Sequence, residues 1–245
     1  MSYGNSPGYY KEGNILLPKN KAIYFFIPKV ACTSIKKVIA DSLDYKIKNI
    51  NDPQSIHLIH FPYEKRNEIK KGDDFFKFAF VRNPWGRILS SYKQKISDNS
   101  NVNNREFKDG VFKPWKQMYG AKFWAGMSFK EFVNEVFLIS DEFAESHFRS
   151  QHTFLTDSKG ELLPDFIGKF ENLQEDFNIV CKEIGTKVVT LPMLTTSDHK
   201  HYNEYYDEDT KSLIRSRYKK DIELFGYEFE DEWSTKNKYN HCSQK

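Results

Sequence analysis

Two apolar runs, each followed by a polar loop and then by helical spacing, constrain this chain more than any other feature. Ala22–Ile27 is continuously apolar, and Phe75–Val81 reads FFKFAFV. Such runs are typical of strands buried on both faces of a parallel sheet. Apolar residues recur at helical spacing from about residue 33 to 43 and again after Pro84. The order strand, helix, strand, helix predicts an α/β fold with helices on both sides of the sheet.

The remaining elements are predicted from weaker patterns. A second strand lies at either Tyr45–Ile50 or Ile56–Ile59, and the pattern does not choose between them. Tyr63–Lys70 favours a polar helix, whereas Ser97–Gly120, rich in Asn, Lys and Gly, predicts a long loop. The other expected elements are a strand at Phe166–Phe170, a helix directly after it, and helices at Phe129–Phe143 and Thr210–Tyr218.

Length and composition fit one soluble globular domain. The chain has 245 residues, of which 39% are hydrophobic and 29% are charged. We expect a loose lead-in over residues 1–20, a single domain over 21–230 and a polar tail over 231–245.

Charge and cysteine content narrow the class of protein. The net charge is only +3, and basic residues form short pairs such as Lys36-Lys37 and Lys219-Lys220 rather than a stripe. This argues against a nucleic-acid partner and fits one anionic small molecule in a local basic pocket. The three cysteines are far apart and have no metal-ligand spacing. No apolar signal core and no run of about 18 apolar residues occurs, so we expect a cytoplasmic protein without a membrane partner.

The loop after the first strand has the layout of an anion site. Residues 27–34 read IPKVACTS, and the helix that follows would direct backbone N–H groups and its positive end at an anion. Thr33 and Ser34 add hydroxyl donors, and Lys29 adds a cation. The order of residues in this loop differs from that in the glycine-rich loop that binds a magnesium–nucleoside triphosphate. Taken by itself, the stretch is equally compatible with an ordinary Ser/Thr helix cap.

A second polar cluster follows the second strand. FVRNPWGRILSSY places Arg82 at the carboxyl end of a buried strand, the edge where open parallel sheets bind ligands. Ser90 lies two turns into the next helix, with Arg87 between them. An arginine fork and a serine hydroxyl suit a phosphate dianion. Two such sites in one sheet point to a nucleotide that is phosphorylated at two places.

Together the two motifs resemble those of sulfotransferases that use 3′-phosphoadenosine 5′-phosphosulfate (PAPS), and more narrowly of the carbohydrate-type family. The resemblance continues through HFRSQHTFLTD, DFIGKFENLQEDF and the later DIELFGY, and it covers approximately Lys21 to Phe229. It implies a three-layer fold like that of P-loop NTPases, with a central, mostly parallel sheet flanked by helices. It also implies a carbohydrate or similar hydroxylated acceptor, with PAP (3′-phosphoadenosine 5′-phosphate) as the product.

The resemblance also assigns the site. It implies that the loop, with Pro28, Lys29, Thr33 and Ser34 as its main contacts and Val30, Ala31 and Cys32 between them, holds the 5′-phosphosulfate. Many bacterial members carry glycines where this chain has Val30-Ala31-Cys32. The 3′-phosphate is assigned to Arg82 and Ser90. In TTSDHKHY, Ser197 and Lys200 could close over the nucleotide.

The expected chemistry is sulfuryl transfer without a metal. Lys29 would neutralise the leaving phosphate oxygen. A histidine near the strand ends would take the proton of the acceptor hydroxyl. SIHLIHFPYEK offers two, and the resemblance favours His60 over His57. His147 and His152 could line the acceptor cleft or serve the structure.

Two other functions compete with this one. A nucleotide kinase would use the same fold, but the expected loop glycines are missing. A non-catalytic nucleotide-binding protein would keep the fold without turnover, and the presence of Lys29, His60 and Arg82 together argues against it.

Overall fold

The computed structural model describes residues 14–42, 56, 61–65, 68–116, 118, 120–192 and 201–230. The chain forms two compact units, and each is discontinuous in sequence. The first, which we call the sheet unit, comprises residues 1–82 and 151–196, and the second, the helical unit, comprises residues 83–150 and 197–245. The expectation of one domain over residues 21–230 stays a prediction.

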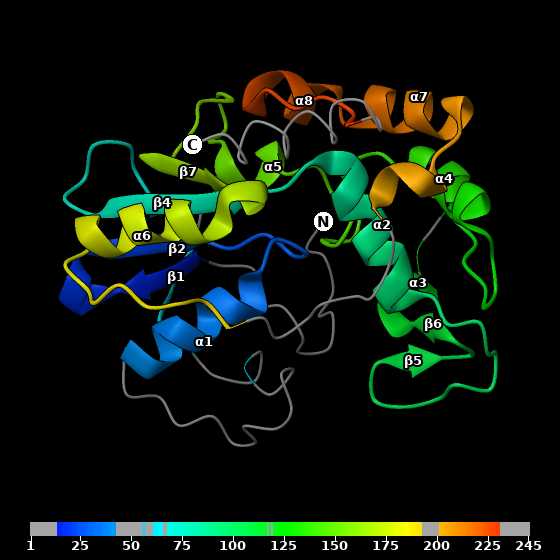
Figure 1. Ribbon diagram of the computed structural model, residues 1–245, viewed down its shortest axis with the longest axis horizontal. Coiled ribbons are helices and arrows are strands. Elements are labelled where there is room, and N and C mark those ends of the chain that lie inside the picture. Colours follow the sequence, from blue (N-terminus) through cyan, green and yellow to red (C-terminus); the bar gives the residue numbers. More distant parts are fainter. Residues whose placement is uncertain are drawn as a thin grey trace, which may run out of the picture. The chain divides into compact units, whose positions relative to one another are not determined.

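The sheet unit is built on five strands in the order β3-β1-β2-β4-β7. β2 pairs with β4 and β4 pairs with β7 in parallel, whereas β1 pairs antiparallel with both β2 and β3. Figure 1 shows β1, β2, β4 and β7 side by side. The strands are β1 Asn14–Leu17, β2 Ala22–Phe25, β3 Tyr63–Glu64, β4 Phe76–Val81 and β7 Phe166–Lys169.

The strands β2, β4 and β7 confirm the sequence predictions, but half of the strand pairs, those of β1, are antiparallel, so the sheet is mixed rather than mostly parallel. β1 lies within the segment expected to be a loose lead-in, and β3 replaces the start of the helix predicted at Tyr63–Lys70, so both expectations were wrong there. β1 forms because it pairs with the adjacent β2, and β3 forms because it pairs with the distant β1: Ile15 pairs with Tyr63, and the Leu16 N–H donates to the Pro62 carbonyl at 2.8 Å. The second-strand candidates, apart from Ile56, lie outside the described residues.

The centre of the sheet is aromatic. Tyr24 stacks on Phe78, and Phe78 contacts Phe80 edge to face. On the same face Phe80 packs against Phe177 of α6 (Leu173–Glu183). A Cβ at Gly168 would lie 2.5 Å from the Phe80 ring, so only glycine fits this position of β7. The continuous apolar runs are therefore explained by burial on both faces, since every residue of β2 is buried.

The helices of the sheet unit follow the strands. α1, Cys32–Ser42, begins within one residue of the predicted start. Besides α6, the described part of this unit contains the short helical segments η1 Pro18–Asn20, α5 His152–Leu155 and η4 Phe170–Asn172.

The helical unit packs around an aromatic core. Its helices are α2 Pro84–Lys95, α3 Lys113–Lys116, α4 Phe129–Phe137, η5 Tyr202–Tyr205, α7 Glu208–Arg217 and α8 Lys219–Phe225. α4 starts at a capping box made by Ser128 and Glu131, and it ends six residues before the predicted limit of Phe143. Trp115 stacks on Phe132 at the centre of this unit.

The segment Ser97–Gly120 is more structured than the predicted loop. It contains the hairpin β5 (Phe107–Lys108) and β6 (Val111–Phe112), followed by α3. Phe112 and Trp115 are 2% and 1% exposed, so burial of these two rings anchors the segment. Within the described ranges, no helix is both long and apolar enough to cross a membrane.

Candidate functional site

The loop between β2 and α1 turns sharply without a glycine. Lys29 and Ala31 have φ angles of 71° and 48°, in the left-handed region that favours glycine. Each such residue costs about 1–2 kcal/mol of strain. Non-glycine residues in this region persist only where the surrounding structure enforces them, and they cluster at functional sites.

The end of this loop is a helix N-terminus. The first i to i−4 hydrogen bond of α1 runs from the Ile35 N–H to the Ala31 carbonyl at 3.1 Å. The N–H groups ahead of such a bond have no intrahelical partner, and the helix dipole is positive there. Thr33 and Ser34, 7% and 6% exposed, lie on this first turn. The segment therefore has the local geometry of an anion site.

Arg82, at the end of β4, lies against the same loop. Its Nη1 donates to the Lys29 carbonyl at 3.1 Å, and its guanidinium carbon lies 4.1 Å from the centre of the Phe170 ring. The side chain is half-buried. The structure thus brings together Lys29 and Arg82, which are 53 residues apart in sequence.

A residue missed by sequence reasoning holds Arg82 in place. The Arg82 N–H donates to Gln151 Oε1 at 2.9 Å, and Gln151 Nε2 donates to the Arg82 carbonyl at 2.8 Å. Gln151 is 0% exposed. Its amide continues the hydrogen bonding of β4 beyond the last strand residue. The sequence marks Gln151 only through the resemblance that includes HFRSQHTFLTD, because no local pattern identifies a glutamine that pairs with a distant backbone.

Ser90 belongs to the helical unit. α2 starts with Pro84 at its first position, and the side chain of the preceding Asn83 accepts a hydrogen bond from the Trp85 N–H at 3.1 Å. This cap fixes the start of the helix, and Ser90 follows on it at 9% exposure. Its role in binding phosphate stays a prediction. The other predicted site residues, His57, His60, Ser197 and Lys200, lie outside the described residues.

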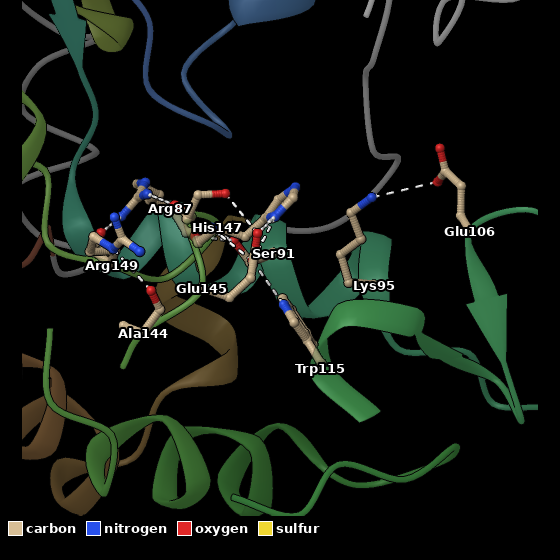
Figure 2. A network of polar contacts seen from close by, with 10 residues as sticks. Arg87, Ser91, Lys95, Glu106, Trp115, Ala144, Glu145, His147 and Arg149 are labelled. Atoms are coloured by element: carbon tan, nitrogen blue, oxygen red, sulfur yellow. Dashed lines mark hydrogen bonds and ion pairs between the residues drawn. The ribbon is translucent and has the colours of Figure 1, made fainter. Parts of the chain in front are cut away.

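Arg87, which the sequence places between Arg82 and Ser90, is a buried structural cation. It is 1% exposed, and it donates from Nη1 to the Arg149 carbonyl at 2.7 Å and from Nη2 to the Ser146 carbonyl at 2.9 Å (Figure 2). Burial lowers the pKa of its guanidinium, whereas nearby ionisable groups raise it, among them Glu145. Arg87 therefore ties α2 to the segment that precedes Gln151.

His147 is part of the same network. Its Nδ1 lies 2.8 Å from Glu145 Oε2, and the Trp115 Nε1–H donates to the same oxygen at 2.9 Å (Figure 2). Burial raises the pKa of the Glu145 carboxyl, but His147 and hydrogen bonds from Ser146 and Trp115 outweigh burial and hold it well below its usual range. Ser91 Oγ donates to the His147 carbonyl at 2.9 Å. Of the two roles considered for His147, this geometry favours the structural one.

The described residues contain no cluster of three or more His, Cys, Asp or Glu side chains that could hold a metal ion.

Residues 14–228 match the model of the sulfotransferase family. Carbohydrate sulfotransferase 14 from Danio rerio is 24% identical over 228 residues, which is 85% of this chain and 60% of that protein. The human protein of the same name is 27% identical over 64% of this chain and 43% of its own length. Carbohydrate sulfotransferase 12 from Xenopus laevis is 25% identical over 92% of this chain and 62% of that protein.

The chain thus spans between 43% and 62% of the length of these relatives. The family match covers both the loop before α1 and the motif Phe80–Tyr92, which contains Arg82 and most of α2. This chain belongs to the sulfotransferase family.

Proposed function

We propose that this protein transfers the sulfuryl group of PAPS to a hydroxyl of a carbohydrate or similar acceptor. The observation that carries the proposal is the contact of Arg82 with the Lys29 loop at the N-terminus of α1. It brings the guanidinium of Arg82 to the backbone of the loop that carries Lys29 and leads into a helix N-terminus, which suits a ligand with more than one anionic group. The names of the relatives, all carbohydrate sulfotransferases, support the acceptor class.

The residues divide between the two ends of the donor. We assign the 5′-phosphosulfate to Lys29 and to the first turn of α1, including Thr33 and Ser34. We assign the 3′-phosphate to Arg82 and Ser90, because an arginine fork and a hydroxyl together satisfy several oxygens of a phosphate dianion. Ser197 and Lys200 are kept as further proposed contacts of the nucleotide.

The reaction is an in-line displacement at sulfur. The bond between sulfur and the 5′-phosphate oxygen breaks, a new bond forms to the acceptor oxygen, and the products are PAP, the sulfate ester and one proton. Lys29 would stabilise the charge that develops on the leaving oxygen. We propose His60 as the group that takes the acceptor proton, with His57 as the alternative. The proposed step is complete without a metal ion. The cytoplasmic location stays a prediction.

Calorimetry with nucleotides tests the donor assignment. We expect the wild type to bind PAP at least tenfold more tightly than adenosine 5′-phosphate, and Arg82→Ala to abolish this preference. Arg105→Ala, which removes an exposed arginine, is the matched control and should keep the preference. Equal affinities of the wild type for the two nucleotides would refute the assignment.

A turnover assay with PAPS, a panel of carbohydrates and EDTA tests the reaction. We expect turnover that survives the chelator. His60→Ala should reduce it by about 10²–10⁴-fold while PAP binding stays normal, and His57→Ala should have a much smaller effect. Loss of turnover in EDTA would point to kinase-like chemistry instead. The reverse order of the two histidine variants would move the base to His57.

A further inference from the structure

A second lysine lies close to the candidate site, buried in the first half of α1. Lys36 is 2% exposed, and its ammonium lies 3.6 Å from the centre of the Phe26 ring. It makes no hydrogen bond or ion pair with any residue of the described part of the chain. Burial lowers the pKa of Lys36 from 10.5 to about 8. Buried charges are normally paired, so this lysine departs from the usual rule.

The position of Lys36 on the helix makes the charge more unfavourable. Helical side chains lean toward the N-terminus, and residues four apart lie on one face, so Lys36 extends toward Cys32 on the first turn of α1. Burial lowers the pKa of Lys36, and Cys32 offsets part of this effect by raising it. A cation at this end of a helix is repelled by the positive end of the dipole. An anion at the same place would relieve both the repulsion and the desolvation.

A second buried polar group faces the same region. The Tyr24 hydroxyl is buried and has no hydrogen-bond partner among the described residues. The ring centres of Tyr24 and Phe26 are 6.5 Å apart, and the Lys36 ammonium lies over the Phe26 ring, so Tyr24 and Lys36 both lie next to Phe26. Buried hydroxyls without a partner are rare and point to an absent acceptor. A buried ammonium whose described contact is the Phe26 ring, together with a buried hydroxyl that has no described partner, indicates a place for an anion.

We propose that Lys36 is a second lysine of the donor site and binds the 5′-phosphate end of the nucleotide from the side of α1. The inference rests on the proposed function and deepens it. Lys29 neutralises this end of the ligand from the loop, and Lys36 neutralises it from the first half of the helix. The ligand chemistry that this arrangement recognises is a phosphate or phosphosulfate with at least two anionic oxygens, which matches the 5′ end of PAP and PAPS.

Calorimetry with two ligands and two variants tests this role. Lys36→Met removes the charge and keeps the apolar stem, and Lys37→Met is the matched control on the half-buried neighbour. We expect Lys36→Met to weaken PAP binding at least tenfold and to leave adenosine 3′-phosphate, which lacks the 5′-phosphate, within twofold. Lys37→Met should change neither affinity by more than twofold.

The outcomes separate this inference from the proposed function. If the wild type does not bind PAP, the proposed function fails. If the wild type binds PAP and Lys36→Met binds it equally well, Lys36 is not a ligand residue and the inference fails.

If Lys36→Met does not fold, a measurement on the wild type tests the proposal instead. Binding of PAP at pH 8.5 should take up protons, because the bound phosphate favours the charged form of Lys36. The uptake is measured by calorimetry in two buffers with different heats of ionisation. The absence of proton uptake would overturn the proposal.

Discussion

Two buried cations in this protein have opposite surroundings. Arg87 in the helical unit and Lys36 in the sheet unit are 1% and 2% exposed. Arg87 donates to the carbonyls of Ser146 and Arg149, and its charge lies near the carboxylate of Glu145. Lys36 contacts the Phe26 ring and, in the described part of the chain, no anion.

The difference distinguishes a buried cation with a structural role from a buried cation that binds a ligand. A buried cation whose donors are satisfied within its own unit stabilises that unit, and its removal leaves polar partners unpaired. A buried cation without an acceptor destabilises the ligand-free protein. The presence of such a cation is explained if a bound anion accepts its hydrogen bonds. Two predictions test this contrast, and a third tests the backbone strain of the loop before α1.

The largest effect is expected at Arg87. Arg87→Leu leaves two partly buried carbonyls without their donors and removes the buried positive charge near Glu145, so the free energy of unfolding should fall by about 3–5 kcal/mol. Urea unfolding followed by tryptophan fluorescence measures this loss, because Trp85 and Trp115 are buried in the helical unit. Arg105→Leu, at an exposed position, should stay within about 0.5 kcal/mol of the wild type. A loss below about 1 kcal/mol at Arg87 would remove the contrast.

An effect of opposite sign is expected at Lys36. In the ligand-free protein Lys36→Met should raise the free energy of unfolding by up to about 3 kcal/mol at pH 7, because the pKa of Lys36 is lowered by burial from 10.5 to about 8. Between these two pH values the unfolded state holds the proton that the folded state has lost. The wild type therefore gains stability as the pH rises through this window, and the advantage of the variant shrinks.

Urea unfolding of both proteins from pH 7 to 10.5 measures the effect of Lys36. Cys32 and Tyr24, the titratable groups near Lys36, are present in both proteins, so the difference isolates the lysine. A variant that is less stable than the wild type at every pH would show that Lys36 is satisfied within the chain, like Arg87.

The smallest effect is expected in the loop itself. Ala31 has a φ angle of 48°, which glycine adopts without strain. Ala31→Gly should raise the free energy of unfolding by about 1 kcal/mol or less, because relief of strain is partly offset by the greater freedom of glycine in the unfolded chain. A thermal melt of the two proteins gives the sign. A clear decrease in melting temperature would mean that the backbone at Ala31 is not strained.

Part of the fold was predictable because its cause is local. β2 is a continuous apolar run, and β4 is apolar except for Lys77. α1 begins at Cys32, directly after the loop that follows β2, and α2 begins at Asn83-Pro84. β3 was missed because its partner β1 lies nearly fifty residues earlier in the chain, and β1, which also pairs with the adjacent β2, was missed because it has no strong pattern of its own. The hairpin β5–β6 was missed for a similar reason, since the Asn-rich composition hides the buried Phe112 and Trp115.

The candidate site divides in the same way. Lys29, Thr33 and Ser34 could be selected from the sequence because strand, loop and helix follow each other directly. Gln151 and Lys36 could not be selected. A glutamine that pairs with the Arg82 backbone and a lysine buried among aromatic rings are defined by contacts between distant segments or by burial, and burial is not visible in a Lys-Lys pair.

The sequence by itself determined which residues could bind an anion, because the type and order of side chains around a strand–loop–helix unit are properties of consecutive residues. Only the tertiary structure decided which cations are satisfied. In the folded protein two carbonyls accept hydrogen bonds from Arg87, and Arg82 lies against the loop. Lys36 and the Tyr24 hydroxyl have no described hydrogen-bonding partners. The physical reason is that the energy of a buried charge depends on the groups packed around it, and these come from segments far apart in the chain.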